Sequence, residues 1–217
     1  MFELSFSLPR LIAALPVARR KSGVTGMNDV FLNHLGLLCA LGNTSEDVAS
    51  ALRRGHSPGM TMQPGFLPGR PVMVGQVLAD LPSLADRPLP HQSRNNRLLL
   101  AALAQIRAGV DLALQRYGAH RVAAIIGTST SGIGEGEEAM RERVAHGAFP
   151  PGFDYRQQEL SSAVHCLVEE LGLKGPAYVI STACSSSARA LISAARLIKA
   201  GLADAVIAGG VDSLCRF

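Results

Sequence analysis

The chain has 217 residues, of which 47% are hydrophobic, 18% are charged and 5% are aromatic, and its formal net charge is +4. This length suits one large domain or two small ones, and the apolar content excludes a disordered chain. No apolar stretch approaches the roughly 18 uninterrupted residues of a transmembrane helix. The hydrophobic residues are therefore expected to form a buried core, with no membrane partner.

Most of the positive charge lies near the amino terminus. Residues 1–26 carry a net charge of +3, which leaves +1 for residues 27–217. A nearly neutral body lacks the clustered basic face of a nucleic-acid-binding protein, so no nucleic-acid partner is expected. We expect residues 1–26 to be a disordered or mis-started extension and residues 27–217 to form the domain. The basic residues follow the apolar stretch 4–17, the reverse of a secretory signal.

The four cysteines give no indication of a metal site. Cys39, Cys166, Cys184 and Cys215 show no C-x-x-C spacing and no histidine at zinc-ligand intervals. Without a signal peptide, disulfides are not expected either, and the predicted compartment is the reducing cytoplasm. Cys39, Cys166 and Cys215 are interpreted as small buried hydrophobic residues.

Helical and strand patterns alternate along the chain. Thr44 and Asp47 favour a helix that begins there and ends at Gly55. Apolar residues at three- and four-residue intervals predict a long helix over residues 97–117 with one broad buried face. The other expected helices cover residues 135–146, 160–171 and 185–200, and the expected strands cover residues 30–33, 72–77, 122–126, 178–182 and 205–208. This alternation predicts an α/β layered fold.

Three glycine- or proline-rich segments separate these elements. Residues 57–71 hold four prolines and three glycines and are expected to be a loop, and residues 147–158 are expected to form an aromatic loop. Gly209 and Gly210 end the last strand and are expected to allow close backbone approach near the turn at Cys184.

Cys184 is the main candidate for chemistry. It lies where the strand 178–182 runs directly into the helix 185–200, so its sulfur is expected near unpaired amides and the positive end of a helix dipole. Both features favour the nucleophilic thiolate, and the same amides could stabilise an oxyanion. The competing interpretation from local geometry alone is a packing residue at a helix start.

Several ordered motifs resemble one family. These motifs are Thr182-Ala-Cys-Ser-Ser-Ser-Ala, the flanking segments 175–180 and 194–212, and the upstream segments 121–132 and 36–44. Together they resemble the N-terminal half of β-ketoacyl-acyl-carrier-protein synthases. The resemblance covers about residues 28–217 and implies a thiolase-like layered fold, of which this chain would be the N-terminal half only.

The resemblance implies a decarboxylative Claisen condensation of fatty-acid or polyketide type. An acyl group would pass from the phosphopantetheine of an acyl carrier protein to Cys184, and a malonyl-carrier protein would then lose carbon dioxide and attack the thioester. Thr128, Ser129, Phe153 and Ser185 are the expected substrate-binding residues. No metal or other cofactor is implied. Retention of cysteine argues against the family's chain-length factors, in which the nucleophile is replaced.

The family's two catalytic histidines are not matched in this sequence. They belong to motifs of the C-terminal half, and the six histidines here are at positions 34, 56, 91, 120, 146 and 165, which match neither motif. The chain alone is therefore expected to be inactive. A homodimer or a separately encoded C-terminal half is the expected partner besides the carrier protein. The alternatives are a truncated remnant or non-catalytic subunit that contributes a dimer surface, and a thiolase or coenzyme-A-priming synthase of the same fold.

Overall fold

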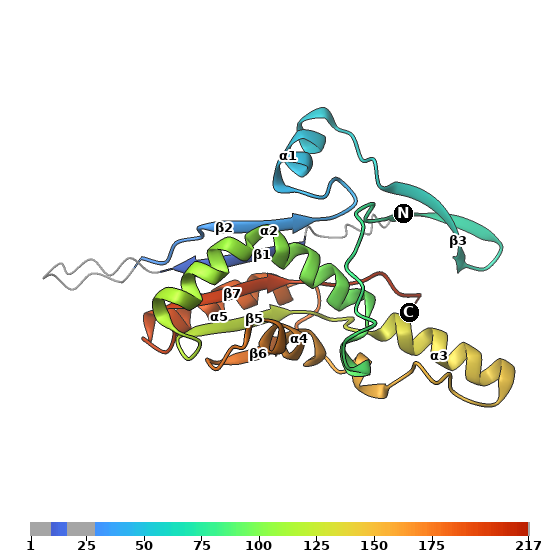
Figure 1. Cartoon of the computed structure of the whole chain (residues 1–217). Coiled ribbons are helices and arrows are strands. Elements are labelled where there is room, and N and C mark those ends of the chain that lie inside the picture. Colours follow the sequence, from blue (N-terminus) through green and yellow to red (C-terminus); the bar gives the residue numbers. More distant parts are fainter. Residues whose placement is uncertain (1–9, 17–28, 217) are drawn as a thin grey trace, which may run out of the picture.

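The computed structural model describes residues 10–16 and 29–216 (Figure 1). Its centre is a five-stranded sheet in which the last three strands, β5, β7 and β6, are parallel, whereas β1 runs antiparallel to both of its neighbours. In sheet order the strands are β2 (His34–Leu38), β1 (Arg10–Pro16), β7 (Ala205–Gly210), β5 (Val122–Gly127) and β6 (Ala177–Ile180).

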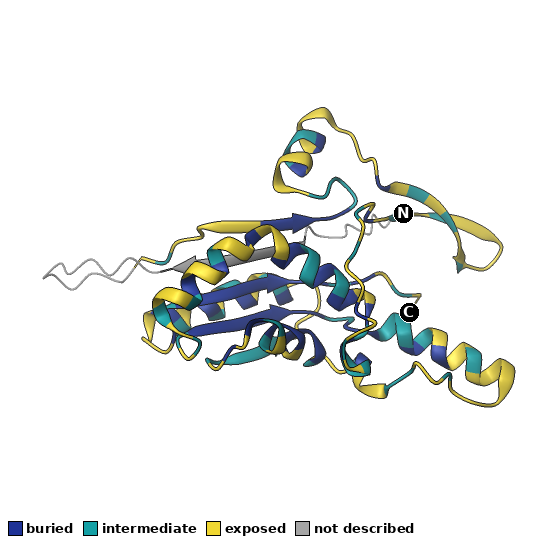
Figure 2. Cartoon of the chain, viewed as in Figure 1, coloured by how far each residue is buried: buried dark blue, intermediate teal, exposed yellow. Residues whose placement is uncertain are grey.

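Helices cover both faces of this sheet and create two apolar cores. Alternate residues of β5 face opposite layers: Ile126 packs with α2 and α4, whereas Ile125 packs with α5. The strand is buried along its whole length, which explains its continuous apolar sequence (Figure 2). The result is the thiolase-like α/β layered arrangement expected from the sequence. The helices are α1 (Ser45–Arg54), α2 (Arg94–Tyr117), α3 (Ile133–His146), α4 (Ser162–Leu171) and α5 (Ser186–Lys199), with 3₁₀ turns η1 (Leu89–His91) and η2 (Tyr155–Gln158).

Helix α2 is the long helix expected from the apolar spacing. It begins three residues earlier than predicted because the Ser93 hydroxyl accepts a hydrogen bond from the Asn96 amide at 3.2 Å and caps the helix there. By length and hydropathy alone, α2 could cross a membrane. Nine of its residues are buried, and its apolar face packs in the core beside β5 and β7. Burial of this face in the core thus explains the apolar composition of α2.

Both ends of helix α1 lie where the capping residues in the sequence predicted them. The Thr44 hydroxyl accepts a hydrogen bond from the Asp47 amide at 3.1 Å, and Gly55 ends the helix in the left-handed conformation. The later elements agree with prediction within one to three residues at each end, except that η2 lies inside the expected loop 147–158.

Two predictions for the first half of the domain are wrong. The strand expected at residues 30–33 lies instead at His34–Leu38. This strand, β2, packs closely on α2, since a Cβ atom at Gly36 would meet the Ala102 carbonyl oxygen at 2.2 Å. Residues 57–71 were expected to be a loop, yet β3 (Met60–Leu67) pairs with β4 (Arg70–Gly75). This hairpin is a separate two-stranded sheet with free edges, which tolerates proline, and its register shifts between Gln63 and Leu67.

One segment of the expected disordered or mis-started extension forms a strand. Residues 10–16 form β1, paired on both sides inside the sheet. The rest of the expected extension, residues 1–9 and 17–26, lies outside the described residues.

The buried face of α2 is expected to contribute strongly to stability. Leu99 is fully buried, whereas Leu112 on the same helix is 61% exposed. We predict that Leu99→Ala lowers the free energy of unfolding by about 2–5 kcal/mol, through lost transfer energy and a residual cavity. The matched control Leu112→Ala should change it by less than about 0.5 kcal/mol. Urea denaturation monitored by circular dichroism measures both, and equal losses would contradict the assignment of this face.

Candidate active site at the carboxyl ends of the parallel strands

Cys184 lies in the turn between β6 and α5, two residues before the helix begins. Cys184 is exposed, whereas Ser186, two residues later, is buried. Ala183 has a φ of 51°, a left-handed conformation that costs a non-glycine residue about 1–2 kcal/mol. The sharp turn places Cys184 at the amino end of α5, as the sequence predicted.

Serine hydroxyls hold this strained turn. Ser186 Oγ donates to the Ala183 carbonyl at 2.7 Å and accepts from the Thr182 amide at 2.9 Å. Ser185 Oγ donates to the Thr182 carbonyl at 2.8 Å. The serines after the cysteine therefore stabilise the backbone conformation that presents it.

A second turn, residues 128–130 after β5, packs against the first. Ser129 Oγ donates to the Ala183 carbonyl at 3.3 Å and lies 3.4 Å from Ser186 Oγ. Thr128 is fully buried, and its hydroxyl accepts from the Ser131 amide at 3.2 Å and from Asn95 Nδ2 at 3.4 Å. Hydroxyl contacts thus connect the turn after β5 to the turn that carries Cys184.

One carboxylate oxygen fixes the turn after β5. Asp212 Oδ1 accepts hydrogen bonds from the Ser129 amide at 2.7 Å, the Thr130 amide at 3.1 Å, and the hydroxyls of Thr128 and Thr130 at 3.1 Å each. Charge-assisted bonds of this kind are among the stronger hydrogen bonds in proteins. Asp212 lies two residues after β7, so it joins the ends of β7 and β5 beside Cys184.

Two glycines bring α5 against these strands. A Cβ atom at Gly127 would meet the Ser186 carbonyl carbon at 2.4 Å, and one at Gly210 would meet Ser187 Oγ at 1.8 Å. The expectation that Gly210 permits close approach near the Cys184 turn is confirmed. Any larger residue at these positions would move the start of α5 away from the sheet.

The structure gathers three of the four predicted substrate-binding residues near Cys184. Thr128, Ser129 and Ser185 belong to the two turns, where their hydroxyls make internal hydrogen bonds. Phe153 lies in the aromatic loop, where its ring stacks on Phe149 with centroids 5.1 Å apart. As substrate contacts, all four stay predictions.

Sequence reasoning missed the role of Asp212 and of Ser186. Asp212 belongs to the segment that carries the family resemblance, but its sequence does not indicate which amides it binds. The available signal was its position, because a residue two positions after a buried parallel strand lies at the end of the sheet where the neighbouring parallel strands also end.

The histidines do not gather around Cys184. His34 begins β2 and His120 precedes β5, so both lie at the amino ends of their strands. Cys184 lies at the other end of the sheet, beyond the carboxyl ends of these strands. His91 Nδ1 lies 3.2 Å from a Glu169 carboxylate oxygen, and His146 pairs with Glu142 on α3. Among the described residues, no group of three or more His, Cys, Asp or Glu side chains could hold a metal ion.

The other cysteines have different surroundings. Burial raises the pKa of the Cys166 thiol from 9.0 to about 11. Cys39 is also buried, whereas Cys215 is half-buried. Of the four cysteines, Cys184 is the exposed one.

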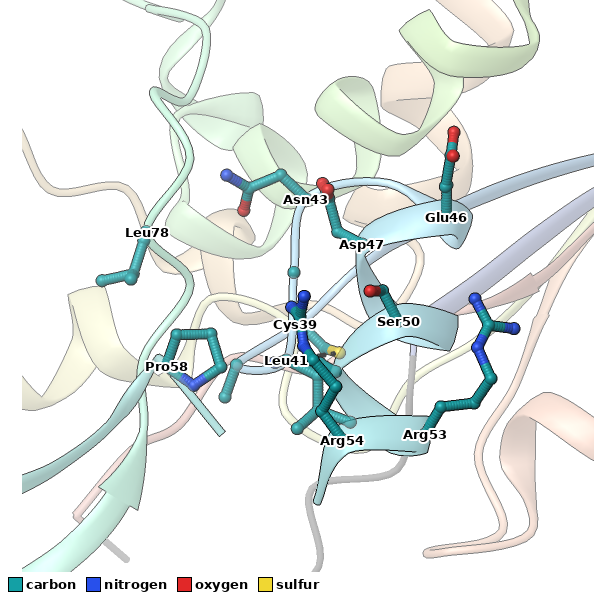
Figure 3. Close-up of a pocket in the computed structure, with 13 residues that line it drawn as sticks. Cys39, Leu41, Asn43, Glu46, Asp47, Ser50, Arg53, Arg54, Pro58 and Leu78 are labelled. Carbon is teal, nitrogen blue, oxygen red and sulfur yellow. Dashed lines mark hydrogen bonds between the residues drawn. The ribbon is translucent and has the colours of Figure 1, made fainter. Parts of the chain in front are cut away.

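A separate cavity of about 470 Å³ lies beside α1 (Figure 3). Its lining includes Glu46, Asp47, Arg53 and Arg54 of α1, with Leu78 on the facing segment. None of its lining residues belongs to the turns around Cys184, so this hollow is not part of the candidate active site.

The fold is thiolase-like, and the cysteine turn lies between β6 and α5. The family model "Beta-ketoacyl synthase, N-terminal domain" matches residues 79–216, which include the whole candidate site. The chain belongs to the β-ketoacyl synthase family.

Known relatives agree with this family assignment. The chain is 28% identical over 187 residues to nodulation protein E of Rhizobium sp. (strain N33), covering 85% of this chain and 46% of the relative. It is 28% identical to 3-oxoacyl-[acyl-carrier-protein] synthase 1 of Escherichia coli (strain K12), covering 87% and 48%. The chain spans about half the length of the curated relatives it matches.

A solved structure is also similar over the whole chain. It is the complex of the ketosynthase ApeO with its chain length factor ApeC from Xenorhabdus doucetiae, with a TM-score of 0.77 and 40% sequence identity. The match covers 100% of this chain and 50% of the solved chain.

The Asp212 carboxylate is expected to be the main support of the site. We predict that Asp212→Ala lowers the free energy of unfolding by about 1–3 kcal/mol, because it leaves amides of the turn without their acceptor. Asp212→Asn keeps a carbonyl oxygen at the Oδ1 position and should cost less. Chemical denaturation of the three chains tests this order, and equal stability of Asp212→Ala and the wild type would contradict it.

Proposed function

We propose that the chain supplies the acyl-accepting half of a β-ketoacyl synthase, with Cys184 as the nucleophile. The exposed sulfur at the start of α5 carries this proposal. The Cys184 sulfur would attack the carbonyl carbon of an acyl thioester on carrier-protein phosphopantetheine. A thioester to Cys184 forms, and the carrier thiol leaves with a proton. The positive end of the α5 helix dipole stabilises negative charge on the sulfur during this step.

The turn also limits which amides can bind the oxyanion. The Ser185 and Ser186 amides donate to the carbonyls of Thr182 and Ala183 at 3.3 Å and 3.1 Å. We therefore propose that, within this turn, the amide of Cys184 itself meets the thioester oxygen. This refines the expectation that several amides of the turn share that role, because two of them are already used to fix the turn.

The second half-reaction needs groups that this chain does not bring to Cys184. Malonyl-carrier protein would lose carbon dioxide, and the resulting carbanion would attack the Cys184 thioester to form the β-ketoacyl product and release the thiol. The described histidines lie on other elements, and two of them, His91 and His146, pair with Glu169 and Glu142. We propose that the histidines for decarboxylation come from a complementary half, so that the isolated chain is inactive in condensation.

The proposed partners follow from the relatives. The E. coli relative is named for an acyl-carrier protein, and the Xenorhabdus ketosynthase was solved with its chain length factor. We propose that this chain accepts acyl groups from an acyl carrier protein in the cytoplasm and works in an assembly with a second chain. No metal or redox cofactor enters either half-reaction as proposed.

Alkylation tests the nucleophile directly. We predict that iodoacetamide labels Cys184 faster than Cys39, Cys166 and Cys215, and faster in the folded chain than in the same chain unfolded in urea. Exposure alone cannot exceed the unfolded rate, whereas stabilised negative charge on sulfur can. Peptide mass spectrometry measures each rate, and Cys184→Ser is the control. A folded rate for Cys184 at or below the unfolded rate would indicate a remnant without an active nucleophile.

Decarboxylation tests the need for a complementary half. We expect the purified chain to release carbon dioxide from malonyl-carrier protein no faster than Cys184→Ser does, since neither supplies the two histidines. The complete E. coli synthase serves as the positive control in the same assay. Robust turnover by this chain alone would overturn the proposed division of labour.

A further inference from the structure

The hairpin of β3 and β4 presents three methionines on one face. Met62 pairs with Met73, and Met60, two residues earlier on β3, pairs with Gly75. Directly opposite residues of an antiparallel pair share a face, as do residues two apart on one strand. The three methionines are exposed, with exposed fractions of 39% for Met60, 53% for Met62 and 54% for Met73. The residues that alternate with them, on the other face of the hairpin, are half-buried (Figure 2).

The Met60 side chain reaches across to β4. Its Sδ lies 3.6 Å from the position that a Cβ atom at Gly75 would occupy. Because Gly75 is two residues after Met73, the Met60 sulfur lies over β4 beside the place of Met73. Met62 is directly opposite Met73, where Cβ atoms are about 4.5–5.5 Å apart. Methionine side chains have three rotatable bonds, so the three thioethers can turn toward one point beside Met73.

The ligand atoms on this face determine which metal ions suit it. Residues 60–75 contain no Asp, Glu, His or Cys, so the thioethers are the metal-binding side chains of the hairpin. Thioether sulfur is a soft ligand that selects Cu(I), whereas carboxylate and carbonyl oxygens suit Mg²⁺ and Ca²⁺. Thioethers are also uncharged, which suits a monovalent ion. Arg70, the charged residue of the segment, alternates with Met73 and therefore lies on the other face.

We propose that Met60, Met62 and Met73 form a binding site for the soft monovalent cation Cu(I). The hairpin projects from the main sheet and its helices, so the ion can approach from solvent (Figure 1). The inference does not depend on the reaction proposed above, because none of these residues belongs to the turns around Cys184. The other use of an exposed methionine face is contact with another protein surface, and the experiment below distinguishes the two.

Silver(I) nitrate is the probe, because Ag(I) is a soft monovalent ion that needs no reductant. The test uses the full chain with Cys184→Ser and Cys215→Ser, since accessible thiolates would compete for the ion. The remaining cysteines, Cys39 and Cys166, are buried and stay in place. Methionine is labelled with carbon-13 in its methyl group, so that nuclear magnetic resonance reports on each thioether in chloride-free buffer.

A specific site shifts a defined set of methyl resonances. We expect one equivalent of Ag(I) to shift those of Met60, Met62 and Met73 together and then to saturate. Met140 on α3 is 53% exposed, as Met62 is, so it serves as the matched internal control and should not shift. An equal shift at Met140, or shifts that do not saturate at one equivalent, would overturn the proposal. No shift at the three methionines would also overturn it and would leave the face as a contact surface.

Leucine variants and pH test the thioethers themselves. Met62→Leu and Met73→Leu nearly conserve side-chain volume, and each should weaken Ag(I) binding by about tenfold or more, since loss of even an outer partner of a metal ligand costs about 10–100-fold. Met140→Leu should change nothing. Thioethers carry no proton to lose, so the affinity should be equal at about pH 5 and about pH 7, unlike that of thiolate or imidazole ligands. Unchanged affinity in both hairpin variants, or a clear fall in affinity at the lower pH, would overturn the assignment.

Discussion

A single carboxylate oxygen, Oδ1 of Asp212, holds the ends of the parallel strands together. It accepts four hydrogen bonds from the turn after β5, and that turn contacts the Ala183 carbonyl through Ser129. The left-handed conformation of Ala183 would be costly without such neighbours, because strained backbone persists only where its surroundings fix it. The exposure of Cys184 thus depends on a network whose centre lies at the end of another strand.

Small residues make this network possible. Gly127 and Gly210 leave no space for a Cβ atom where Ser186 and Ser187 begin α5. The first turn of the helix therefore rests on the backbone of β5 and β7, and its amino end is fixed relative to both. A catalytic group on such a helix needs little reorganisation when it reacts, since the rigid sheet supports the backbone around it. The two cores on either side of the sheet supply that rigidity.

The sequence was most informative where one physical effect dominates. The buried strand β5 and the amphipathic α2 could be predicted because burial alone determines their patterns. The place of Cys184 between β6 and α5 could be predicted because strand, turn and helix signals meet there. The prolines near β3 hid a hairpin whose free edges tolerate them, and β1 was missed because its pairing depends on strands that are remote in sequence. The role of Asp212 was hidden for the same reason, since its partners lie more than 80 residues away.

The two edges of the sheet differ in their capacity for further pairing. At one edge, the carboxamide of Gln105 satisfies both backbone groups of Leu37, as a neighbouring strand would. At the other edge, β6 pairs only with β5 among the described strands, and its residues are half-buried. Exposed edge strands are the usual route by which sheets join, and side chains that occupy an edge prevent it. Extension of this sheet by another molecule would therefore use β6, the strand that leads directly to Cys184.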